Sequence, residues 1–234
     1  MTADKDARTW GPELRKTRIY DALVLDIVTG ALPPGAPLVE RHLADARGWG
    51  VAGVREALNR LSLEGLVVRQ PRTGTVVAAI DRAEVEQAFE IRSLMDARSA
   101  GLAARHATAA DKAALGGAFD GAEAAIAAAD DRALIAMDRA FHRAVARATH
   151  NPMLARWLDQ LWVTAARWWV CAMERQAPAE QLADVRLHRD LARAVAAGDV
   201  SAAEAAMARL IGDPPSLTPP APAPELRRPE PASA

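Results

Sequence analysis

The strongest constraint on the fold of this chain is an abrupt change of sequence pattern at Asp81. Before it, residues 66–69 and 75–78 form two runs rich in β-branched side chains, separated by a turn of proline and glycine. Such a pair of runs predicts a β-hairpin. After it, alanine-rich segments with helical periodicity continue to about residue 211 with almost no strand signal. We therefore expect a mainly α fold with a single hairpin.

Three short helices are predicted before the hairpin, at about residues 14–29, 40–47 and 52–64. Glycine and proline mark the turns between them, because these residues end helices and favour turns. Three helices followed by a hairpin within about 80 residues is the order of a winged helix-turn-helix, in which one helix enters the major groove of DNA. We assign this unit to residues 13–80.

The candidate DNA contacts lie on the predicted outer surface of this unit. Arg55 lies near the start of the third helix, and Asn59 follows one turn later. Arg41 lies in the second helix, while Arg72 and Thr73 lie at the tip of the hairpin. The first 80 residues hold 11 Lys and Arg against 9 Asp and Glu, and the whole chain has a formal net charge of −1. Charge alone therefore does not distinguish DNA contacts from solvated surface residues.

The rest of the chain predicts an all-helical bundle over residues 81–211, flanked by a disordered arm (1–12) and a disordered proline-rich tail (212–234). Its helices are predicted at residues 82–106, 109–129, 131–148, 152–176, 179–197 and 201–211. Asp138 and His142 are four residues apart, so they share one helix face and could form half of a metal site. For an isolated Asp/His pair, a surface salt bridge or a buried hydrogen bond is more common than a metal site.

Several motifs of the N-terminal unit occur together in one order. The segment GALPPGAPLVERHLA (30–44) resembles the opening signature of the GntR family of regulators. VREALNRL (54–61) and EGLV (64–67) resemble its recognition helix and the entry to its wing, and RTGTVV (72–77) resembles the wing. The resemblance implies a transcriptional regulator, expected to be a repressor, that binds a double-stranded DNA operator as a homodimer.

One segment departs from that family pattern. Residues 50–53 read Gly-Val-Ala-Gly where family members usually carry a Ser-Arg-Thr-Pro-like run. An N-cap hydroxyl and a cation are lost together. This predicts altered or weakened operator recognition, with Arg55 and Arg41 as the principal remaining contacts.

The helical half resembles the ligand-binding domain, called FCD, of the FadR-type branch of the family. EIRSLMD (90–96), the Asp-x-x-Phe-His motif (138–142) and NPML (151–154) carry the resemblance, and His188 matches the next histidine of the pattern. It implies that Asp138, His142 and His188 hold one divalent metal ion such as zinc, nickel or manganese. The position of the usual fourth histidine falls on Leu210. A three-ligand site completed by water or effector and a metal-free pocket both remain open.

Arg92 has two interpretations. In the resemblance it points toward the effector cavity, where its guanidinium could bind the carboxylate of a small-molecule effector. From spacing alone it is an intrahelical partner of Asp96, four residues later. With this arginine, the predicted effector-binding residues are Arg92, Asp138, His142 and His188.

The sequence leaves two alternatives to an effector-controlled regulator. The Asp138, His142 and His188 cluster could activate a metal-bound water, as in a metal-dependent hydrolase, or the chain could bind DNA without any effector. We expect no enzyme, because no nucleophile elbow or phosphate loop is present. The chain also has no signal peptide or apolar membrane span and a single cysteine, Cys171, which predicts a cytoplasmic protein.

Overall fold

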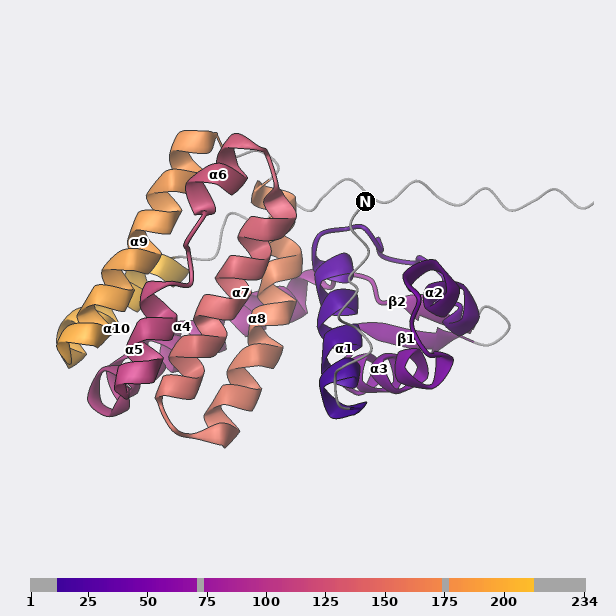
Figure 1. Cartoon of the computed structure of the whole chain (residues 1–234), viewed down its shortest axis with the longest axis horizontal. Helices are drawn as coiled ribbons and strands as arrows, with labels where there is room; N and C mark the ends of the chain where they lie inside the picture. Colours follow the sequence, from indigo (N-terminus) through magenta and orange to yellow (C-terminus); the bar gives the residue numbers. More distant parts are fainter. Residues whose placement is uncertain (1–11, 71–73, 174–176, 213–234) are drawn as a thin grey trace, which may run out of the picture.

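The computed structural model describes residues 12–70, 74–173 and 177–212, which form two parts lying side by side (Figure 1). The N-terminal part contains α1 (Pro12–Val28), α2 (Glu40–Arg47), α3 (Val51–Leu63), β1 (Val67–Gln70) and β2 (Gly74–Val77). The two strands pair antiparallel, with Val67 opposite Val77 and Arg69 opposite Thr75. Three helices followed directly by a hairpin confirm the predicted winged helix-turn-helix, with helix limits within two residues of those expected.

Some predictions fall on residues that the structure does not describe. The hairpin-tip contacts Arg72 and Thr73 are among these, as are residues 1–11 of the predicted arm and 213–234 of the predicted tail. Pro12 was assigned to the arm in the sequence prediction but is the first residue of α1. Proline suits the first turn of a helix, because the N–H that it lacks would have no partner there.

The start of α3 reflects the unusual residues 50–53. Gly50 is the N-cap residue and makes no side-chain hydrogen bond, which agrees with the predicted loss of the capping hydroxyl. A Cβ atom at Gly53 would lie 2.7 Å from Cδ1 of Ile19 in α1. Glycine at this position therefore lets the recognition helix pack closely against α1.

The C-terminal part is an all-α bundle, as predicted. Its helices are α4 (Arg82–His106), α5 (Ala109–Gly116), α6 (Ala122–Ala127), α7 (Asp131–Ala148), α8 (Pro152–Met173), α9 (Pro178–Ala197) and α10 (Val200–Ile211). Five of them begin with a side chain that accepts a hydrogen bond from the first turn, namely α4, α5, α7, α8 and α10. None of the described helices is long and apolar enough to cross a membrane.

The single helix predicted over residues 109–129 is wrong, because the chain forms two short helices there. α5 ends at Gly116, and α6 begins at Ala122 after Gly121. Gly121 has a φ of 89°, in the left-handed region that favours glycine. Two consecutive glycines at 116 and 117 also weaken the helix, so the alanine-rich periodicity overstated its length.

The two parts pack against each other where α1 meets α7 and α8 (Figure 1). Ile135 of α7, with Trp162, Val163 and Ala166 of α8, belongs to the same buried cluster as the apolar face of α1. We call this contact the α1 seam. The N-terminal part thus completes its hydrophobic core with side chains of the bundle.

Ion pairs flank the apolar centre of the α1 seam. Asp26 is 1% exposed and lies between Arg47 of α2, at 2.5 Å, and Arg132 of α7, at 2.7 Å. Asp21 of α1 lies 3.3 Å from Arg139 and 3.0 Å from Arg143, both in α7. Paired charges on both sides of an apolar centre fix the position of the N-terminal part on the bundle.

Candidate ligand site and DNA-reading face

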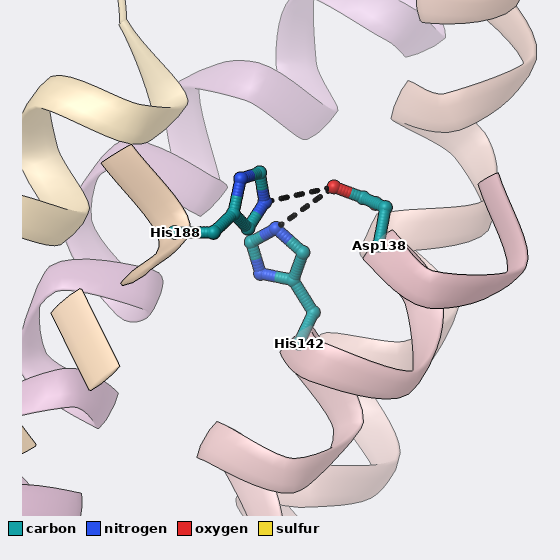
Figure 2. A group of neighbouring side chains, drawn as sticks. All are labelled: Asp138, His142 and His188. Atoms are coloured by element: carbon teal, nitrogen blue, oxygen red, sulfur yellow. Dashed lines mark hydrogen bonds and ion pairs between the residues drawn. The ribbon is translucent and has the colours of Figure 1, made fainter. Parts of the chain in front are cut away.

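Asp138, His142 and His188 come together in the bundle, with their ring nitrogens and carboxylate oxygen facing one another (Figure 2). Oδ1 of Asp138 lies 3.6 Å from Nε2 of His142 and 3.0 Å from Nε2 of His188. The donor atoms of all three lie within 4.8 Å of one another. The cluster therefore joins α7 and α9, whose residues are about 50 positions apart in the sequence.

Local structure aims each imidazole at the carboxylate. The four-residue spacing in α7 puts Asp138 and His142 on one helix face. His188 is 1% exposed, and its Nδ1 donates a hydrogen bond to the backbone carbonyl of Asp184 at 2.9 Å. The rings of Phe119 and Phe141 pack against it, with centroids 4.4 and 5.0 Å away. This leaves Nε2 of His188 directed toward Asp138.

Burial and charge shift the protonation of the cluster. Burial lowers the pKa of His142 to about 4, against the opposing charge of Asp138, so this imidazole is neutral at pH 7. Burial also acts to lower the pKa of His188, but the hydrogen bond and charge of Asp138 outweigh it, and the pKa is raised. The pKa of Asp138 is well below its usual range, because the two histidines outweigh its burial.

A cavity opens beside the cluster. Its wall includes four aromatic side chains and several polar ones: Phe89, Phe119, Trp162, Trp169, Arg92, Asp138, His142, Gln181, Asp184 and His188. The space open to the centre of a water-sized molecule is about 70 Å³, several times the roughly 10–15 Å³ that one water needs. Leu210 also lines it, so the position expected for a fourth histidine offers no donor atom.

Arg92 takes part in both arrangements that the sequence left open. It lines the cavity, and its Nε donates to Oδ2 of Asp96 at 2.7 Å in a buried pair. The side chains of Arg92 and Asp96 are 5% and 6% exposed. Asp96 thus fixes the position of the guanidinium that lines the cavity wall.

Three cavity residues were missed by the sequence analysis. Gln181 and Asp184 lie seven and four residues before His188 in α9, so they share its helix face. This spacing alone would have predicted that they lie near His188. Trp162 donates its indole N–H to Oδ2 of Asp138 at 2.6 Å. No sequence pattern connects Trp162 with Asp138, because the two residues lie on different helices, α8 and α7.

The predicted DNA contacts lie on the exposed surface of the N-terminal part. Arg41 and Asn59 are exposed, and the Arg55 side chain is 60% exposed. Arg55 is paired with Glu40 at the start of α2, with Nη2 2.8 Å from Oε2. Val54, Ala57, Leu58 and Leu61 form the buried face of α3.

Arg69 is a further cation on this surface that the sequence analysis did not select. It lies on β1, is exposed, and donates through Nη2 to Oδ1 of Asn59 at 2.5 Å. The wing strand and the recognition helix thus hold a guanidinium between them. We call the exposed residues Arg41, Arg55, Asn59 and Arg69 the candidate DNA-reading face, or DNA-reading face for short.

A winged helix-turn-helix joined to a helical bundle with a polar cavity defines a class of transcription regulators. Residues 15–77 match the family "Bacterial regulatory proteins, gntR family", and residues 87–213 match the FCD domain. The FCD match covers more than half of the chain. The chain therefore belongs to the GntR family of regulators that carry an FCD domain, as the sequence motifs indicated.

Named relatives agree with this membership. The chain is 30% identical over 194 residues to the "Probable D-xylose utilization operon transcriptional repressor" of Paenarthrobacter nicotinovorans, covering 82% of this chain and 83% of that protein. It is 29% identical over 134 residues to the HTH-type transcriptional regulator McbR of Escherichia coli K12, covering 57% and 61%. These relatives are named as transcriptional regulators, so the comparisons do not favour the hydrolase alternative.

Solved structures share the architecture. Escherichia coli McbR/YncC superposes with a TM-score of 0.73 at 25% identity, covering 84% of this chain and 93% of that one. A GntR transcriptional regulator from Rhodococcus sp. RHA1 gives a TM-score of 0.64 at 22% identity, covering 85% and 94%, and shows the shared fold. The likeness spans both the winged helix-turn-helix and the bundle.

Replacing Asp184 should change how stability depends on pH. Burial raises the pKa of Asp184 to about 6, against the opposing charge of His188. Between the unfolded pKa of about 4 and this value the folded state holds more protons, so stability falls as pH rises. The melting temperature of Asp184→Asn relative to the unmodified protein should therefore rise from pH 4 to about 6.5 and then level off.

The measurement is thermal unfolding in the presence of chelator. Asp190→Asn is the control, because Asp190 lies on the same helix but has a side chain that is 43% exposed and paired with Arg193. The titration of His142 is common to both proteins and cancels in the difference. A constant difference between Asp184→Asn and the unmodified protein across this range would contradict the raised pKa.

Proposed function

We propose that this GntR regulator is a repressor that binds a two-fold symmetric operator as a homodimer and is controlled by a small carboxylate effector in the bundle cavity. The observation that carries the proposal is the exposed Arg55 on α3, backed by a hairpin, on the same chain as a polar cavity. One end has the side chains to read DNA, and the other has space and ligands for a small molecule.

The DNA-reading face supports operator binding through two kinds of contact. Arg55 lies near the N-terminal end of α3, the end of a recognition helix that touches base edges. A guanidinium there discriminates between bases by about 1–3 kcal/mol. Arg69 is held to Asn59 at the side of α3, where it is placed for a phosphate. We therefore assign base reading to Arg55 and backbone contact to Arg69.

Substitutions on this face should separate the two roles. Arg55→Ala should weaken binding to an operator enriched from random duplexes by roughly 5- to 150-fold and relax its sequence preference. Arg69→Ala should weaken binding to all sequences alike and reduce the slope of log Kd against log salt by about 1. Fluorescence anisotropy at several salt concentrations measures both.

Arg98→Ala provides a matched control, because Arg98 is an exposed arginine of α4 paired with Glu204. It should bind the operator as the unmodified protein does. Failure to enrich any sequence over random duplex would refute operator binding. Equal losses for Arg98→Ala and Arg55→Ala would refute the assigned face.

The donor set of the bundle site fits a divalent metal ion. Ligands held tetrahedrally at about 2.0–2.1 Å from zinc lie roughly 3.3 Å apart, and the carboxylate-to-imidazole distances here are 3.0 and 3.6 Å. A ligating imidazole must be neutral: His142 already is, whereas His188, whose pKa is raised, would release a proton when the ion binds. We propose that Asp138, His142 and His188 hold one ion, zinc, nickel or manganese, with other positions left for water or effector.

The charges of the cavity support a carboxylate effector. A bound divalent cation attracts an anionic oxygen, and the fixed guanidinium of Arg92 lines the same cavity. Gln181 and Asp184 add hydrogen-bonding groups on the α9 side. Aromatic rings form much of the remaining wall. This combination suits a small organic acid that also carries hydroxyl or other hydrogen-bonding groups.

Calorimetric titration of metal-stripped protein with zinc, nickel and manganese ions tests the site. One ion should bind per chain, and His142→Ala and His188→Ala should each weaken binding by more than about 100-fold, beyond the effect of an outer-shell partner. His150→Ala is the control, since His150 is exposed and paired with Asp111. The absence of binding, or an equal loss for His150→Ala, would refute the metal site.

A thermal-shift screen with small carboxylates, with and without metal, then tests the effector. A ligand that prefers the native state raises the melting temperature, by an amount that grows with its concentration above Kd. If no acid stabilises the protein in either state, the effector-independent DNA binder is the better description.

Exposed apolar side chains support the homodimer. Four of the exposed large hydrophobic residues in the described part of the chain lie on α4 and α8, which pack against each other: Ile91, Leu94, Met153 and Trp157. Leu94 is 73% exposed and Trp157 is 53% exposed. Large apolar groups that face solvent mark interaction surfaces. A second copy is the partner that a two-fold symmetric operator requires.

Light scattering after gel filtration tests this surface. The unmodified protein should have about twice the chain mass of 24.9 kDa. The double variant Leu94→Asp and Trp157→Asp should shift toward the monomer, because charges would be buried unpaired in the interface. Leu63→Asp is the control, since Leu63 is 90% exposed on α3. A double variant that remains dimeric would contradict the assignment.

A further inference from the structure

Three side chains of the α1 seam, Ile135, Trp162 and Ala166, also line the cavity of the candidate ligand site, and Trp162 bonds directly to its carboxylate. Its indole N–H donates to Oδ2 of Asp138 at 2.6 Å, while Oδ1 of the same carboxylate faces His142 and His188. The Trp162 ring is 3% exposed and belongs to the apolar cluster of the α1 seam. One oxygen of the Asp138 carboxylate thus faces the histidines of the site, and the other accepts a hydrogen bond from a side chain of the α1 seam.

Arg139 provides a second connection immediately beside Asp138 in α7. It is 3% exposed, and its guanidinium carbon lies 5.5 Å from the Trp162 ring centroid and 5.8 Å from that of Tyr20 in α1. It also pairs with Asp21 at 3.3 Å. The helix that carries the site therefore contacts α1 through a buried cation.

Tyr20 extends this connection to the recognition helix. Its hydroxyl donates to Oε2 of Glu64, the residue that follows α3, at 2.5 Å. The guanidinium of Arg60, in the last turn of α3, lies 3.6 Å from the Tyr20 ring centroid, and it pairs with Glu64. Tyr20 thus fixes the C-terminal end of α3 relative to α1.

From these contacts we propose that Trp162, Arg139 and Tyr20 form a relay that transmits occupancy of the bundle site to the recognition helix. A cation bound at Oδ1 of Asp138 withdraws negative charge from the carboxylate. The hydrogen bond that Oδ2 accepts from Trp162 becomes weaker, because charge-assisted hydrogen bonds depend on that charge. The α1 seam loosens, and α3 follows through Tyr20. Trp162 acts here as a positioning residue.

The relay rests on the proposed ligand site but not on DNA binding. Amide hydrogen exchange of the full chain without DNA therefore tests it separately from the proposed function. Zinc ion is the probe, and calorimetry measures its binding to each variant. In the unmodified protein, saturating zinc should increase exchange at least threefold at amides near the end of α3 and in α1, since local opening sets these rates.

Trp162→Phe keeps an aromatic ring but removes the N–H donor. As the loss of an outer-shell partner of Asp138, it should weaken zinc binding by no more than about 100-fold, and at saturating zinc the response of α1 and α3 should be lost. The matched control is Trp168→Phe, because Trp168 lies on the same helix, is 5% exposed and packs in the bundle core. It should keep the response. A response in Trp162→Phe equal to that of the unmodified protein would overturn the proposal.

A ligand-free arm keeps the proposal testable if zinc does not bind. Asp138→Ala removes the acceptor of the Trp162 N–H, so exchange in α1 and α3 should rise at least threefold without any metal. Asp190→Ala removes a carboxylate of α9 that is 43% exposed and should leave the exchange unchanged. Tyr20→Phe should preserve the response of α1 and reduce that of α3. Unchanged exchange in Asp138→Ala would refute the relay even if zinc binds as proposed.

Discussion

Both halves of this structure depend on the contacts made by the carboxylate of Asp138. This carboxylate is partly buried, at 31% exposed, and an ionised carboxylate with reduced access to water is stabilised when its oxygens are hydrogen-bonded or paired. Here two imidazoles face one oxygen and an indole N–H satisfies the other. Because Trp162 is also part of the core of the N-terminal part, the group that forms the candidate ligand site also holds the DNA-reading unit in place.

The position of α1 explains why the two parts are joined so closely. One side of this helix packs on the recognition helix, where Gly53 permits a short approach, and another contacts α7 and α8. Asp21 and Asp26 pair with arginines on both sides of the apolar contact. Interfaces between domains generally permit motion unless they are large and apolar. A mixed seam of this kind is specific in its geometry yet can be loosened by changing a few polar contacts.

The sequence predicted the elements of this fold well, because turns and helix ends have local causes. Glycines, prolines and capping residues placed most helix limits within a few residues, and the one large error, at 109–129, came from overlooking glycines inside an alanine-rich stretch. Spacing brought Asp138 and His142 together, and family resemblance added His188. The bond from Trp162 to Asp138 and the pairing of Arg69 with Asn59 were not predictable, since both join separate elements whose packing the sequence pattern does not specify.

The low net charge of the chain makes the position of the N-terminal part on the bundle important for the proposed DNA binding. With a formal net charge of −1, the protein has little long-range attraction for phosphate, so binding depends on the placement of a few side chains. To contact DNA as proposed, Arg55 would also have to break its ion pair with Glu40. Each base contact is worth about 1–3 kcal/mol, so misaligning one of them lowers operator affinity by roughly 5- to 150-fold. In the proposed relay, a small displacement of α3 would therefore be sufficient to change operator affinity, and α1 is the element that contacts both α3 and the bundle.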